Sequence, residues 1–155
     1  MTNETSAGWC IQQQLNRFAN CFDLKSWDEM AECLAETLYT DYSDLRGTPP
    51  ETLSRERYIA LRREALDGLK THHLYANHEI TLNQTGATAR VSALIQRLSP
   101  DGQVLDTHCV YLFELDQHGT NWVIRAITQK VLWTQGNPAI HAGIGRQDPS
   151  RQTTS

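Results

Sequence analysis

"KTHHLYANHEITLNQTGATARVSALIQRL", residues 70–98, marks the point where the chain changes from helical to strand-like patterning. Residues 71–82 are rich in β-branched and aromatic side chains, and the turn sequence "NQTG" separates them from a second strand-like segment at 87–98. Two further segments, 104–115 and 121–133, follow the turn sequences "SPDG" and "DQHGTN". Turns of this composition join antiparallel strands, so the sequence predicts a four-stranded meander.

Three of the six histidines lie in the first of these strands. Successive strand side chains point to opposite faces, so His72 and His73 cannot share a ligand. His72 and His78 share a face but stand roughly 20 Å apart, too far for one zinc ion bound at about 2.0–2.1 Å. We therefore expect no metal site, and a single histidine directed into a pocket is the remaining functional interpretation.

The sequence pattern of the N-terminal half predicts three helices. Apolar residues recur at three- and four-residue steps through 9–22, which is typical of a helix with one buried side. Ser26 and Glu29 have the spacing of a capping box for a second helix, and Ser54 is a candidate cap for a third. Between them, residues 37–45 predict a strand and "GTPPET" a loop.

This order of elements predicts an α+β fold in which three N-terminal helices pack on a strongly curved, mostly antiparallel sheet. Such a sheet forms a cone, and its open end is a natural cavity for a small molecule. We expect one domain over residues 8–134. Residues 135–155 predict a C-terminal tail that is largely disordered, because Gly, Pro and polar residues follow no sustained period there.

Composition narrows the choice of partners. The 155 residues carry a net charge of −4, and the one basic cluster, residues 55–63, is expected on the polar side of a helix. Nucleic acid is therefore not an expected partner. We expect no membrane span and no secretion signal. The four cysteines lack CxxC pairing and are expected to be buried and reduced, which favours a cytoplasmic protein.

Four stretches carry a resemblance to a known family: "FDLKSWDEMAECL", "YTDYSDLRG", "KTHHLYANHEI" and "NWVIRAI". Their order and spacing resemble the SnoaL-like branch of the nuclear-transport-factor-2-like superfamily, with a cystatin-like cone fold. Within it the chain is most similar to scytalone dehydratase and its bacterial relatives, including the dehydrochlorinase type. The shared features are an acidic residue and a tryptophan after the first helix, an Asp-Tyr pair, a Thr-x-His and a tryptophan-led last strand.

The resemblance implies that Asp23 and His73 form a catalytic dyad. His73 would be the general base, Asp23 would fix its tautomer, and Tyr42 would orient a substrate oxygen. A histidine has an unperturbed pKa of about 6.5, and a neighbouring carboxylate favours the protonated form. We therefore expect Asp23 to raise the pKa of His73.

The chain also departs from the scytalone dehydratase pattern. Phe22 stands where that enzyme has a tyrosine, and its third-strand histidine is replaced around Arg97 and Leu98. Cys109 and Tyr111 stand where it has serine and asparagine. These departures indicate a different reaction, or none.

Strand alternation extends the candidate pocket. If His73 faces inward, alternate residues on its strand and on the last two strands do so too. The substrate pocket is then expected to contain Phe22, Tyr75, Asn77, Cys109, Tyr111, Ile127, Gln129 and Val131. Alternation places His108 on the outer face, but a strand bulge can reverse this, so His108 is a secondary candidate.

Two classes of function stay open, and a third, the small subunit of a ring-hydroxylating oxygenase, shares the fold but is selected by no feature of the sequence. The first is a cofactor-free lyase or isomerase that removes a proton from a small, cyclic, hydrophobic molecule and causes dehydration, elimination or isomerisation. The second is a non-catalytic ligand-binding or assembly module of the same fold. Apolar residues expected on the outer sheet face, such as Leu94 and Leu112, predict a homodimer or homotrimer.

Overall fold

The computed structural model describes residues 3–141, and the remainder of the predicted tail, residues 142–155, lies outside the described residues. In chain order the elements are α1 (Asn3–Asp23), α2 (Trp27–Glu32), β1 (Leu34–Asp41), α3 (Ser43–Arg46), β2 (Glu51–Ser54), α4 (Arg55–Leu66), β3 (Lys70–Leu82), β4 (Ala87–Leu98), β5 (Val104–His118), β6 (Asn121–Gly136) and the 3₁₀ helix η1 (Pro138–Ile140).

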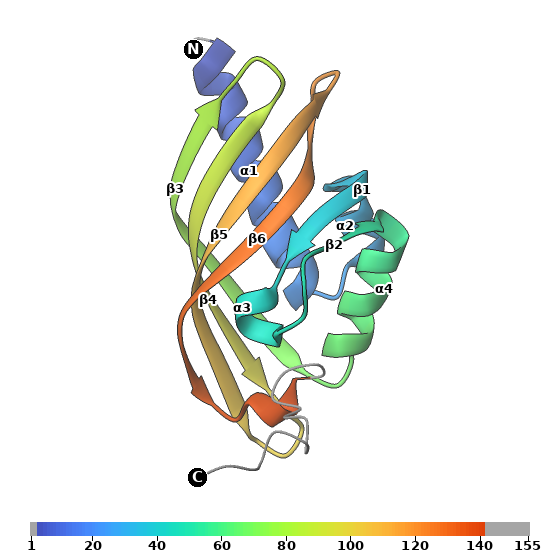
Figure 1. The fold of residues 1–155 in the computed structure, drawn as a ribbon, viewed down its shortest axis with the longest axis vertical. Coiled ribbons are helices and arrows are strands. Elements are labelled where there is room, and N and C mark those ends of the chain that lie inside the picture. Colours follow the sequence, from blue (N-terminus) through green and yellow to red (C-terminus); the bar gives the residue numbers. More distant parts are fainter. Residues whose placement is uncertain (1–2, 142–155) are drawn as a thin grey trace.

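The strands form one sheet in the order β2-β1-β6-β5-β4-β3. The pairs β3–β4, β4–β5 and β5–β6 are antiparallel, which confirms the predicted meander. β1 joins the sheet parallel to β6 and pairs with β2 on its other side. Figure 1 shows the long strands β3 to β6 bending along their length, with α1 against one face of the sheet and α2 and α4 beside β1. The architecture is an α+β cone.

The segment after β1 differs from the prediction. Four α-helices are present in the described residues rather than three, because Ser43–Arg46 forms the short helix α3 instead of continuing a strand. The Asp41 carboxylate accepts hydrogen bonds from the Ser43 backbone N–H, at 3.0 Å, and from its hydroxyl, at 2.6 Å. Such local bonds compete with a strand ladder. Gly47, with φ of 69°, ends the helix.

The loop prediction for "GTPPET" was also incomplete, since its last residues begin β2, which pairs with β1. Ser54 caps α4 as predicted, because its hydroxyl accepts a hydrogen bond from the Arg57 N–H at 3.1 Å. The capping box at Ser26 was wrong. Ser26 is the residue before α2, but its side chain makes no capping hydrogen bond.

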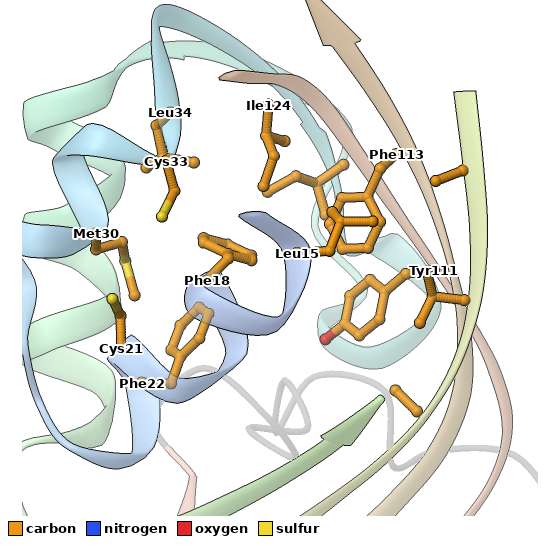
Figure 2. Close-up of a cluster of buried hydrophobic side chains, with 14 of the residues drawn as sticks. Leu15, Phe18, Cys21, Phe22, Met30, Cys33, Leu34, Tyr111, Phe113 and Ile124 are labelled. Carbon is orange, nitrogen blue, oxygen red and sulfur yellow. The ribbon is translucent and has the colours of Figure 1, made fainter. Parts of the chain in front are cut away.

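The core lies between α1 and the concave face of the sheet. Phe18 of α1 is 1% exposed, and its ring centroid lies 6.2 Å from that of Phe113 on β5 and 6.4 Å from that of Tyr58 on α4. Figure 2 shows Leu15 of α1 beside Phe113 of the sheet, and Cys21 of α1 beside Met30 of α2. α1 is therefore held from both sides, which fixes the position of its last residue, Asp23.

Three of the cysteines, Cys21, Cys33 and Cys109, are buried and unbridged, as expected, but Cys10 is exposed. Within residues 3–141, no helix has both the length and the hydropathy needed to cross a bilayer.

A bulge in β3 corrects the predicted pocket. The register between β3 and β4 shifts between Ala76 and Glu79, and Asn77 adopts a φ of 53°. Alternation therefore holds up to Tyr75, which packs against the core, and fails at Asn77, which is exposed. Asn77 does not belong to the pocket.

The β3–β4 hairpin gives a test of the packing. A Cβ on Gly86 would lie 2.2 Å from the Leu115 carbonyl oxygen of β5, whereas one on Gly68 would meet nothing within 4 Å. We expect Gly86→Ala to lower the free energy of unfolding by roughly 1–3 kcal/mol because the backbone must shift. Gly68→Ala is the control, with a change within about 0.5 kcal/mol. Urea denaturation measures both, and equal stability of the two variants would contradict this packing.

Candidate active site

Asp23 and His73 are in direct contact. The His73 Nδ1 lies 2.6 Å from Oδ1 of Asp23, and the two side chains are 6% and 13% exposed. Asp23 is the last residue of α1, and His73 is the fourth residue of β3. The same carboxylate accepts a hydrogen bond from the His73 backbone N–H at 2.8 Å and from the Thr71 hydroxyl at 3.0 Å. The two residues are joined as a unit.

This geometry selects one tautomer of the imidazole. The carboxylate is an acceptor, so the neutral ring places its proton on Nδ1 and donates it to Asp23. Nε2 then carries the free lone pair and is the atom able to accept a proton. Phe22 stacks on the ring with centroids 4.7 Å apart and planes inclined by 19°, which holds the imidazole in one orientation.

Asp23 acts on the pKa of His73 in the predicted direction, but the net shift of that pKa has the opposite direction. Burial lowers the pKa of His73 below 6.5, even though its hydrogen bond to Asp23 and the Asp23 charge act in the opposite direction. Arg97 adds a smaller effect that also lowers the pKa. Desolvation outweighs the carboxylate because the ring is almost fully removed from water. His73 is therefore neutral at pH 7, the state that a general base requires.

His73 lines a small hollow inside the fold. Its volume is about 30 Å³, enough for one or two water molecules. The residues around it come from α1, α3, α4, the sheet and the segment after η1. They are Phe22, Tyr42, Leu45, Arg46, Arg62, Leu66, His73, Ile95, Arg97, Tyr111, Gln129 and His141.

The structure brings only part of the predicted pocket to this hollow. Phe22, Tyr111 and Gln129 line it, together with the predicted catalytic residues His73 and Tyr42. Gln129 is 1% exposed, and its Nε2 donates to the Tyr111 hydroxyl oxygen at 3.0 Å.

Four predicted pocket residues lie elsewhere in the core or at its edge. Tyr75 packs on Tyr111, with ring centroids 5.7 Å apart, and does not line the hollow. Cys109 and Ile127 are buried, at 1% and 0% exposure, in the packed core. Val131 is half-buried, and its backbone N–H donates to the Asp44 carboxylate of α3 at 3.2 Å. They lie on the predicted strands but do not line the hollow.

Tyr42 lies at a different place from the one expected. β1 ends at Asp41, so Tyr42 is the residue before α3 rather than a strand residue. Its hydroxyl lies 2.7 Å from the hydroxyl of Tyr58. Either oxygen can donate in this pair, so Tyr42 keeps the capacity for one further hydrogen bond.

His108 is not part of the hollow. Its ring stacks on Trp133 of β6, with centroids 4.2 Å apart, and its strand neighbours Thr107 and Cys109 are the inward residues. The β6 bulge near this point did not bring His108 inward. The secondary candidate therefore lies on the outer face.

Sequence reasoning missed four polar residues of the site: Arg46, Arg62, Arg97 and His141. Arg62 was expected on the polar side of its helix but is 8% exposed. It lies four residues after Tyr58 and four before Leu66, both buried, so helical spacing could have identified it. Arg97 continues the every-second-residue pattern of the buried residues Val91, Ala93 and Ile95, so strand alternation could have identified it. His141 follows η1, within the segment predicted as tail, and is 3% exposed.

No group of three or more His, Cys, Asp or Glu side chains within residues 3–141 could hold a metal ion. The chemistry that the described site offers is that of an oriented neutral imidazole, a carboxylate behind it, two tyrosine hydroxyls and three guanidinium groups.

The fold and this site define a cone-shaped α+β protein with a buried histidine–carboxylate pair. Comparison with known families agrees. The family model of the SnoaL-like domain matches residues 3–128, so the chain belongs to that family.

Individual relatives are more distant. Over 50 residues the chain is 40% identical to scytalone dehydratase-like protein claB of Passalora fulva, a match that covers 32% of this chain and 31% of that protein. The crystal structure of Kfla4162 protein from Kribbella flavida superposes with a TM-score of 0.82 at 20% identity, over 86% of this chain and 95% of that one. The crystal structure of hexachlorocyclohexane dehydrochlorinase LinA-type3 from Novosphingobium barchaimii superposes with a TM-score of 0.74 at 12% identity, over 89% of this chain and 94% of that one. At these identities the two structures establish the fold.

The state of the imidazole can be measured by NMR. We expect the ring signals of His73 to titrate with a pKa below 6.5, because burial disfavours the charged form. In Asp23→Asn the pKa should fall further, since the carboxylate that favours the protonated ring is gone. His72→Gln assigns the signal of the neighbouring histidine. A His73 pKa above 6.5 in the wild type would contradict the dominance of desolvation.

Proposed function

We propose that this protein is a cofactor-free enzyme that removes a proton from a carbon atom of a small cyclic molecule, leading to dehydration, elimination or isomerisation. The observation that carries the proposal is the 2.6 Å contact between His73 Nδ1 and Asp23. This contact holds the ring proton on Nδ1, so the free lone pair is on Nε2. His73 lines the hollow. Membership of the SnoaL-like family supports a small molecule as the substrate.

The reaction begins when His73 Nε2 takes the proton from the substrate carbon. The electron pair of the broken C–H bond forms a carbon–carbon double bond or an enolate, and in an elimination the leaving group departs with its own electron pair. Asp23 stabilises the imidazolium that forms. The imidazolium then gives its proton to the leaving group or, in an isomerisation, to another carbon. Tyr42 binds the substrate oxygen through its hydroxyl.

The size of the hollow favours a second candidate function. A volume of about 30 Å³ is far below that of a cavity for a drug-sized ligand, which is about 300–1,000 Å³. A filled cone is the expected feature of a binding or assembly module without catalysis. Turnover by the wild-type protein decides between the two candidates.

Proton abstraction can be assayed without knowledge of the product. We expect the wild type to exchange carbon-bound hydrogen for deuterium in D₂O in at least one member of a panel of cyclic ketones and β-substituted cyclic compounds, followed by NMR. His73→Gln and Asp23→Asn should reduce the exchange rate by about 10²-fold or more, because general base catalysis contributes typically 10²–10⁴-fold. His72→Gln, the exposed neighbour on the same strand, is the matched control. Exchange that survives in both site variants would end the catalytic proposal.

We also propose that the protein associates with a second or third copy of itself through the outer face of the sheet, in the cytoplasm, where the buried thiols stay reduced. Leu74, Leu94, His108 and Trp133 are in register across β3, β4, β5 and β6 and form one row on this face. Leu74 and Trp133 are 47% and 52% exposed. An apolar row of this extent is typical of an interface between subunits.

The self-association can be tested by light scattering after gel filtration. We expect wild-type protein to elute with the mass of a dimer or trimer, and Trp133→Glu to shift it toward the monomer because a charge would be buried without a partner. Leu24→Glu, at a 75% exposed position after α1, is the control. A wild-type monomer, or an unchanged mass for Trp133→Glu, would contradict the proposed interface.

A further inference from the structure

Three arginines meet at the same hollow from three different elements. Arg46 comes from α3, Arg62 from α4 and Arg97 from β4, and all three line the cavity beside His73. Arg62 is 8% and Arg97 5% exposed. Arg46 is half-buried. Arginine is almost never fully buried without a partner, so a cluster with two buried members requires an explanation.

No carboxylate in the described residues pairs with any of them. The ion pairs within residues 3–141 that involve arginine use Arg17, Arg55, Arg90 and Arg125. Within the part of the chain that the structure describes, the Nε atoms of Arg46, Arg62 and Arg97 are all buried without a hydrogen-bond partner. Asp23, the acid nearest to His73, already accepts three hydrogen bonds from Thr71 and His73.

The contacts that these arginines do make leave donors free. Arg97 Nη1 donates to the Thr107 hydroxyl at 2.9 Å. The guanidinium carbon of Arg62 lies 5.0 Å from the ring centroid of Tyr42 and 5.3 Å from that of Tyr58. That of Arg46 lies 5.4 Å from the Tyr42 centroid. Cation–π contacts offset part of the desolvation cost but use the face of the guanidinium, so the N–H groups at its edge stay available.

The cluster is electrostatically unfavourable without an anion. Burial, and then the charge of Arg62, lower the pKa of Arg46 to about 10, so it stays charged at pH 7. Buried like charges repel, and desolvated cations destabilise the fold. The fold tolerates two buried arginines and a half-buried one at one point, which is the arrangement expected of a binding site for a negative group.

We propose that Arg46, Arg62 and Arg97 bind the carboxylate of a cyclic carboxylic acid, and that this acid is the substrate of the site. The planar fork of a guanidinium matches the two oxygens of a carboxylate. Other side chains that line the hollow, among them Phe22, Ile95 and Tyr111, are aromatic or apolar and suit the apolar carbon that carries the carboxylate. The description of the acid as a substrate rests on the proposed function of His73, whereas the anion site does not.

Size favours a carboxylate over a phosphate. The hollow of about 30 Å³ admits a group of a few atoms. A planar carboxylate, with one charge shared by two oxygens, is smaller than a tetrahedral phosphate. The hollow therefore holds the carboxylate, and the ring of the acid extends beyond it.

The test is equilibrium binding to the full-length protein, measured by calorimetry with benzoate, benzamide, cyclohexanecarboxylate and inorganic phosphate. We expect benzoate or cyclohexanecarboxylate to bind at least about tenfold more tightly than benzamide, because a hydrogen bond to a charged group is worth about 1.5–3 kcal/mol. Added salt should weaken the binding of the two carboxylates and leave the binding of benzamide unchanged. Equal affinity of benzoate and benzamide, or no binding of either carboxylate, would overturn the proposal. Tighter binding of phosphate would overturn the assignment to a carboxylate.

Variants locate the anion. Arg62→Met and Arg97→Met should each weaken the binding of benzoate about 10- to 100-fold. Arg63 is an exposed neighbour on α4, so Arg63→Met should leave the affinity for benzoate unchanged. If the loss of the Thr107 contact prevents Arg97→Met from folding, Arg62→Lys replaces it, since it keeps the charge and loses the fork. Equal benzoate affinities of Arg62→Met and Arg63→Met would place the anion elsewhere and refute the site.

One further variant separates this proposal from the catalytic one. His73→Gln removes the base and keeps all three arginines, so we expect it to retain the preference for benzoate over benzamide, whatever its absolute affinity for either compound. Carboxylate binding without deuterium exchange in the wild type would therefore support the anion site and refute the enzyme. Exchange on neutral ketones without carboxylate binding would do the reverse.

Discussion

The carboxylate of Asp23 connects the end of α1 to the start of β3, and the functional geometry depends on it. Its three hydrogen bonds fix both the backbone and the ring of His73. An acid at the C-terminal end of a helix is opposed by the helix dipole. Here the adjacent strand supplies the donors that compensate. The packing of Phe18 between the sheet and α4 positions that helix end.

The site combines a neutral histidine with buried positive charge, and each helps to explain the other. The charge of Arg97, one of the three arginines, lowers the pKa of His73 in the same direction as desolvation. An anion bound between the arginines would reduce that repulsion and favour the protonated ring. The acid–base behaviour of His73 would then respond to occupancy of the site, which links the two proposals through charge.

Local sequence patterns predicted the elements well where one rule governed them. The four long strands, the antiparallel meander and the Ser54 cap follow from strand alternation, turn composition and helix capping. The prediction was wrong between Asp41 and Ser54, where side-chain hydrogen bonds at Asp41 and Ser43 redirected the backbone. Helical spacing from Tyr58 and Leu66 also indicated that Arg62 faces inward, but because the residue is charged it was expected on the polar side of the helix.

The amino-acid sequence by itself determined the fold class, the chain order of its long strands and the candidate pair Asp23 and His73. Only the tertiary structure decided which side chains share the hollow. Arg46, Arg62, Arg97 and His141 are separated in the chain and meet because the sheet curves around α1 and α4. The bulge at Asn77 and the sign of the His73 pKa shift were likewise decided by packing. Local patterns report periodicity, whereas desolvation and convergence depend on distant parts of the chain.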